Sequence, residues 1–87
     1  MGRGWRHSGN LRAMNAPTVA LARRLARDGT ARSVRVQAGL SIYDVARDLR
    51  VAPGTISRWE TGKRVPRGDV AVRYAELLGE LMRVATP

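Results

Sequence analysis

After residue 14, glycine and proline divide the sequence into five short segments whose apolar residues recur every three or four positions. This spacing places apolar side chains on one face of an α-helix, whereas a half-buried strand would show strict alternation. No alternating stretch is present in the 87 residues, which suffice for one small core. The sequence therefore predicts an all-α fold, a compact five-helix bundle.

Residues that begin or end helices set the expected boundaries. Pro17 favours a first helical turn, and Gly29 and Gly39 suit the left-handed position that ends a helix. The pattern predicts helices at about 17–28, between 30 and 39, and at 41–50, 53–61 and 68–84. Thr30 is expected to cap the second helix, and the residues expected to face inward there are Val34, Gln37 and Ala38.

The third and fourth segments are joined by a very short connection. Ser41-x-x-Asp44 approximates a capping box at the start of the third helix. Pro53 fixes its own φ and disfavours helical geometry at Ala52, so a new helix begins at Pro53. Two short helices joined by a tight turn are the outline of a helix-turn-helix.

The charge balance points to a polyanionic partner. Sixteen Lys and Arg against seven Asp and Glu give a formal charge of +9. All but one of these cations are arginine, which can bond a phosphate or a guanine edge through two N–H groups, although GC-rich coding would favour arginine equally. Residues 1–14 are expected to form a flexible basic arm before a domain at 15–87. Within the arm, Trp5 and His7 either are mobile and have no role or contact the minor groove of DNA.

Several classes of protein are excluded by what the sequence lacks. Without cysteine there is no disulfide and no thiolate zinc site, so we expect neither metal nor cofactor. His7 is the only histidine and no paired carboxylates or phosphate loop are evident, so an enzyme is not expected. No apolar run approaches the roughly 20 residues of a membrane span, so we expect a cytoplasmic protein that is nucleoid-associated when bound to DNA. We also expect no small-molecule ligand.

Residues 38–66, AGLSIYDVARDLRVAPGTISRWETGKRVP, resemble the Cro/repressor class of helix-turn-helix proteins, also called the XRE family. The matching positions are Ala38-Gly39-Leu40-Ser41, Val45-Ala46, Leu49-x-Val51, the run from Thr55 to Glu60, and Gly62-Lys63-x-x-Pro66. With its flanking helices the resemblance covers roughly residues 30 to 79. It implies a lambda-repressor-like DNA-binding fold, here with an extra N-terminal helix, and a duplex DNA partner.

The resemblance also implies which residues contact DNA. The helix from Pro53 would enter the major groove, and its candidate base-reading residues are Gly54, Thr55, Ser57 and Arg58. The candidate phosphate contacts are Ser41, Pro53, Lys63, Arg64 and Arg67. Arg58 is the strongest base-reading candidate; the alternatives are a phosphate contact or a salt bridge to Glu60 or Asp44. Glu60 itself is expected to cap or pair locally, for instance with an arginine.

Two positions depart from the family pattern, and a third residue offers few contacts. Ile42 stands where the family has a phosphate-binding glutamine, and it either packs or touches a thymine methyl. Arg50 replaces a turn glycine, which implies a less favourable backbone and an added cation near DNA. Gly54 contributes no side chain to the base-reading set, so specificity is expected either to be modest or to depend on DNA shape and on the basic arm.

The last helix carries two apolar stripes, Val70-Tyr74-Leu77-Leu81-Val84 and Ala71-Ala75-Leu78-Met82. One stripe closes the domain, and the other would be exposed without a partner. We expect a homodimer, in solution or on DNA only, with Val70, Tyr74, Leu77, Leu81 and Met82 as interface candidates. The alternative is a monomer in which the N-terminal helix covers the stripe.

These expectations together predict a sequence-specific transcriptional regulator, a phage-type Cro or repressor that acts by occupying a promoter. Two other functions use the same fold. An antitoxin would bind its own operator and also a toxin through the last helix, and a DNA-bending or excision factor would distort the duplex.

Overall fold

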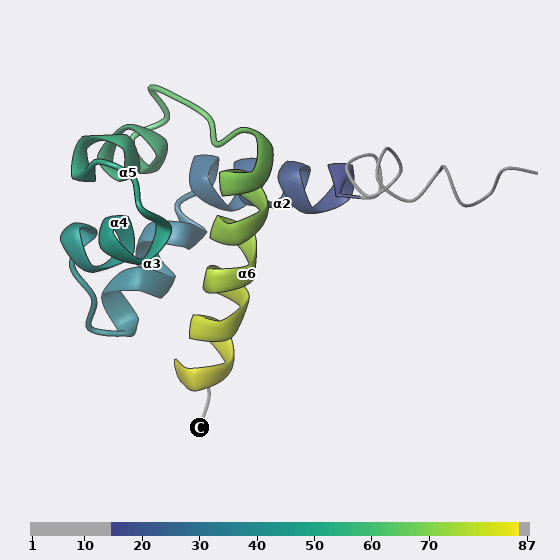
Figure 1. Cartoon of the computed structure of the whole chain (residues 1–87). Helices are drawn as coiled ribbons and strands as arrows, with labels where there is room; N and C mark the ends of the chain where they lie inside the picture. The colour runs from purple at the N-terminus through teal and green to yellow at the C-terminus, as the bar shows by residue number, and fades with distance from the viewer. Residues whose placement is uncertain (1–14, 86–87) are drawn as a thin grey trace, which may run out of the picture.

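The computed structural model describes residues 15–85, which form five α-helices and no strand (Figure 1). The helices are α2 (Ala16–Arg27), α3 (Thr30–Gln37), α4 (Ile42–Leu49), α5 (Pro53–Glu60) and α6 (Gly68–Ala85). The predicted all-α architecture is confirmed. The predicted basic arm, with Trp5 and His7, lies outside the described residues. No helix among the described residues is long and apolar enough to cross a membrane.

Local capping residues begin and end the helices largely as the sequence predicts. The Ser41 hydroxyl accepts a hydrogen bond from the Asp44 N–H at 3.0 Å, and the Asp44 carboxylate accepts one from the Ser41 N–H at 2.8 Å, which completes a capping box. The prediction that Thr30 caps α3 is wrong, because Thr30 is already helical. The Asp28 carboxylate accepts the Thr30 N–H at 2.9 Å instead.

The core lies between the five described helices, each of which contributes buried apolar side chains. Ile56 and Trp59 of α5 are buried against α4, and the Trp59 ring lies 4.8 Å from the ring of Tyr74 in α6. Ala46 is buried at the contact of α4 with α5, as its small side chain predicts. The buried apolar set is Ala22, Leu25, Ala26, Ala31, Val45, Ala46, Leu49, Ile56, Trp59, Ala71, Tyr74, Ala75 and Leu78.

The inward face of α3 differs from the prediction. Gln37 is exposed and its amide donates to the Ser33 hydroxyl at 3.1 Å, while Arg35 is buried in its place. Arg35 follows the buried Ala31 by four residues, so both lie on one helical face. An arginine is tolerated there because a carboxylate from another helix neutralises it.

That carboxylate belongs to Glu60, the last residue of α5. Arg35 donates to it through Nε at 2.7 Å and through Nη2 at 2.9 Å, and its Nη1 donates to the Leu40 carbonyl at 2.9 Å. The Glu60 side chain is only 4% exposed. The expectation that Glu60 pairs with an arginine is confirmed, and the pair fixes the C-terminal end of α5 to α3.

The extra helix α2 crosses the N-terminal part of α6 (Figure 1). Arg23 of α2 donates through Nε to the Pro66 carbonyl at 2.8 Å, so it holds the α5–α6 connection. Arg23 is half-buried at this contact, whereas Arg24 and Arg27 of the same helix are exposed. This contact explains how a helix outside the resemblance supports the motif.

The apolar residues of α6 are divided between the core and the surface. Tyr74 is 1% exposed, so its assignment to a subunit interface is wrong and it belongs to the core with Ala71, Ala75 and Leu78. Its burial raises the pKa of the phenol. Leu77 and Leu81 are half-buried, and Val84 is 79% exposed. Within the described chain, α2 therefore covers the first part of α6 but leaves its C-terminal turns uncovered.

Candidate nucleic-acid interface

The turn between α4 and α5 sets the angle at which α5 leaves the body. Arg50 ends α4 in the left-handed conformation, with φ 59° and ψ 46°. This is the conformation expected at a position where the family has glycine. The Val51 N–H donates to the Ala46 carbonyl at 3.0 Å, and Ala52 is extended, as a residue before proline should be. Arg73 of α6 donates to the Leu49 carbonyl at 3.1 Å and closes the end of α4.

One side of α5 is core and the other is accessible. Ile56 and Trp59 face inward, whereas Gly54, Arg58 and Thr61 are exposed. The predicted contact residues Pro53, Thr55 and Ser57 are half-buried at the margins of the accessible side. The Thr61 hydroxyl donates to the Ser57 carbonyl at 2.9 Å, so it satisfies a carbonyl group at the C-terminal end of α5.

Arg58 has no hydrogen-bond or ion-pair partner for its guanidinium among residues 15–85. The alternative that it pairs with Glu60 or Asp44 is wrong. Glu60 is held by both nitrogens of the Arg35 fork, and Asp44 accepts from Ser41 and lies 3.6 Å from Arg47. An exposed and uncommitted guanidinium on the outer side of α5 is free to bind a base edge or a phosphate.

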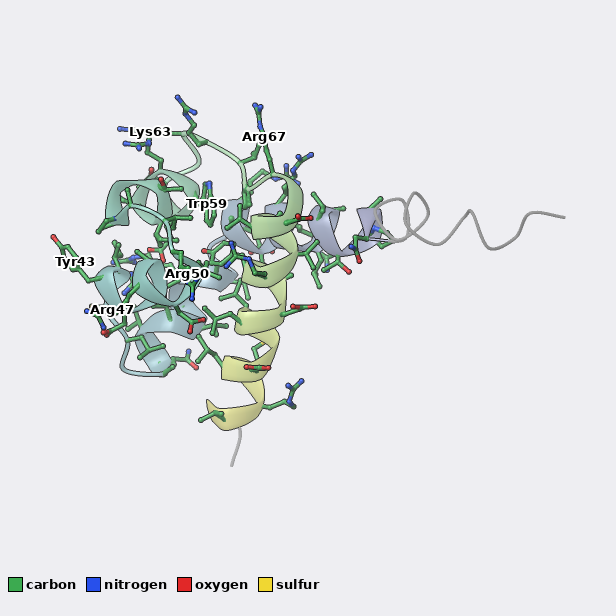
Figure 2. The ribbon with its side chains drawn as sticks, viewed as in Figure 1. Tyr43, Arg47, Arg50, Trp59, Lys63 and Arg67 are labelled. Carbon is green, nitrogen blue, oxygen red and sulfur yellow. The ribbon has the colours of Figure 1, made fainter. Side chains whose placement is uncertain are left out.

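The connection after α5 places further cations beside it. Gly62 takes a left-handed φ of 78°, and the N–H groups of Lys63 and Arg64 both donate to the Arg58 carbonyl, at 2.9 and 3.2 Å. The chain thus folds back on the end of α5. Lys63, Arg64 and Arg67 are exposed, and Figure 2 shows the side chains of Lys63 and Arg67 extending outward from this connection.

A hollow of about 200 Å³ separates α5 from this connection. Arg58, Arg64 and Arg67 line it together with Thr55. Val70 lines the same hollow, which places it beside the motif. Three arginines that line one concavity give it a positive charge, which attracts phosphate oxygens or the acceptor edge of a guanine. No group of three or more His, Asp or Glu side chains in the described residues is placed to hold a metal ion.

Sequence reasoning missed two exposed residues of α4. Tyr43 is 66% exposed, and Figure 2 shows Tyr43 and Arg47 pointing away from the body of the molecule. A phenol close to the capping residue Ser41 offers a donor for a DNA phosphate. The available signal was its position outside the helical face that carries the buried Val45, Ala46 and Leu49. Ile42 packs against the core, which agrees with the packing interpretation of that position.

Two short helices, a tight turn and an outward second helix flanked by exposed cations define a helix-turn-helix DNA-binding domain. A family model described as helix-turn-helix matches residues 32–81, which is more than half of the chain. The chain belongs to this family, the XRE type of helix-turn-helix protein, and is a DNA-binding transcriptional regulator of that type. Comparison with curated proteins and with solved structures found no match.

Proposed function

We propose that this protein is a repressor of the Cro type that recognises a specific duplex sequence and blocks a promoter by occupying it. The observation that carries the proposal is the uncommitted guanidinium of Arg58 on the accessible side of α5. An arginine can donate hydrogen bonds to O6 and N7 of one guanine at the same time, and it thereby distinguishes guanine from the other bases. A surface that is only cationic cannot make this distinction.

The surrounding residues supply affinity and orientation. Lys63, Arg64 and Arg67 would bind phosphates on one side of α5. Ser41, which caps α4, and Tyr43 in the first turn of α4 would bind them on the other. Thr55 and Ser57 lie beside Arg58 and can reach a base or a phosphate. With a formal charge of +9, the chain would approach DNA with a strong and salt-sensitive attraction.

The working unit in this proposal is a homodimer. Val84 is exposed and Leu81 is half-buried, and with Leu77, which also packs partly against the core, they form an apolar stripe on α6, which we name the α6 stripe. Two copies related by a two-fold axis would read two half-sites about 34 Å apart, and pairing of the α6 stripes would cover the apolar surface.

The test is to select bound duplexes from a random pool and to compare two variants on the selected duplex and on a scrambled one. Arg58→Ala should lower affinity for the selected duplex by about tenfold or more, with little change on the scrambled duplex. Arg64→Ala should weaken both similarly and reduce the salt slope by about one. Equal losses on both duplexes for Arg58→Ala would refute its base-reading role.

A further inference from the structure

Gly54 and Arg58 are one helical turn apart, and the arginine lies over the glycine. A Cβ atom placed on Gly54 would lie 3.3 Å from Arg58 Nη1, 3.6 Å from Nη2 and 3.7 Å from Cζ. The shortest of these separations is tighter than an ordinary van der Waals contact. The guanidinium therefore occupies the space that a side chain at position 54 would need.

The direction of the arginine follows from helix geometry. Side chains on an α-helix lean toward its N-terminus, so residue 58 reaches back over residue 54. The N-terminal turn of α5 is also the part that would lie deepest in a major groove. The bare backbone at Gly54 thus allows the guanidinium to lie at the end of the helix that meets the bases.

Backbone conformation does not account for glycine at this position. The glycines with positive φ are Gly29, Gly39, Gly62 and Gly68, and Gly54 is an ordinary helical residue. Glycine inside a helix is less favourable than alanine because it loses more conformational freedom on folding. The space taken by Arg58 is the structural feature that a larger residue at 54 would disturb.

We propose that Gly54 is a specificity-determining positioning residue, and that Gly54 and Arg58 together read one guanine in each half-site. This inference rests on the proposed function, because it assumes that α5 lies in the groove. A methyl group at position 54 would require the guanidinium to move by a few tenths of an ångström. A branched side chain, which needs more space, should displace it further from the N-terminal turn. Gly54 therefore contributes to recognition through Arg58 and makes no base contact of its own.

The experiment replaces each guanine of the selected duplex in turn with 7-deazaguanine, which lacks the N7 acceptor. The wild-type protein should lose about tenfold or more in affinity at one guanine per half-site. Arg58→Ala should be insensitive at that guanine. Gly54→Val should lose most of the same sensitivity, and Gly54→Ala should be intermediate.

Gly79→Ala is the matched control, because Gly79 lies inside α6 without a positive φ, as Gly54 does in α5, and a Cβ there meets nothing within 4 Å. It should keep the wild-type sensitivity, and circular dichroism should show all variants folded. The double variant Gly54→Val/Arg58→Ala should equal Arg58→Ala alone. A Gly54→Val protein that keeps full sensitivity at the guanine lost in Arg58→Ala overturns the positioning role and leaves base reading intact. A wild-type protein indifferent to every 7-deazaguanine overturns both.

Discussion

Arg50 adopts a backbone conformation that an L-residue with a side chain rarely takes. Its φ of 59° places it in the left-handed region, where Cβ crowds the following carbonyl oxygen. The side chain makes no hydrogen bond or ion pair among residues 15–85 that would offset this strain. The turn of the motif therefore holds a local cost of about 1–2 kcal/mol.

Arg50→Gly should stabilise the protein by roughly 0.5–1 kcal/mol, because relief of the left-handed strain exceeds the extra entropy that glycine gives the unfolded chain. Urea unfolding followed by circular dichroism measures the change. Arg47→Gly is the matched control, since Arg47 is an exposed arginine inside α4, and it should destabilise by about 1 kcal/mol. If both substitutions lower the urea midpoint, the backbone of Arg50 carries no strain.

The helices could be predicted from the sequence because their signals are local. Ser41 and Asp44 are three residues apart, and Gly39 and Pro53 act on their immediate neighbours. The contacts that join the helices could not be predicted in the same way. Arg35 binds a carboxylate 25 residues away and Arg23 binds a carbonyl 43 residues away, so neither pairing has a signal in the local pattern.

The candidate site, like the fold, could be predicted from the sequence only in part. The outward position of Arg58 follows from the helical period and from the resemblance to the XRE family. The space over Gly54 does not follow from the sequence, because it depends on the direction of a side chain one turn away. The sequence alone also left open a bond between Arg58 and Glu60. The structure excludes this bond, because Glu60 is paired with Arg35.

The buried pair of Arg35 and Glu60 should be the most sensitive link between elements. Glu60→Ala leaves a guanidinium without its carboxylate in a site that is almost closed to water, so we expect a loss of about 3–5 kcal/mol in the free energy of unfolding. Chemical denaturation at neutral pH measures it. Because the pair fixes the end of α5, DNA affinity should fall together with stability.

Two further variants separate the pair from a general effect of removing charge. Glu76→Ala removes an exposed carboxylate from α6 and should change stability by less than about 0.5 kcal/mol. Arg35→Met/Glu60→Leu replaces both charges with apolar groups and should recover most of the loss. A Glu60→Ala protein as stable as Glu76→Ala would show that the pair contributes nothing.

The molecule as a whole has its cationic side and its uncovered apolar stripe on different elements. The cations that flank α5 belong to the α5–α6 connection, whereas the α6 stripe lies toward the C-terminal end of α6 (Figures 1 and 2). Two copies could therefore join through α6 without covering the proposed DNA-binding residues. This arrangement suits a two-fold complex on DNA, in which each copy leaves its own α5 accessible.

Val84→Glu tests the dimer at a position where the fold is not disturbed, because Val84 is 79% exposed. A carboxylate there would face its two-fold copy, and the like charges would oppose association. The wild-type protein should bind a duplex with two half-sites cooperatively. Val84→Glu should bind each half-site independently, and its affinity for a single half-site should be unchanged.

Val36→Glu is the control, because it places the same charge on another exposed valine, which lies on α3 and is 54% exposed. This variant should remain cooperative. Binding curves and stoichiometry by gel shift and sedimentation distinguish these cases. Independent half-site binding by the wild-type protein would show that it acts as a monomer.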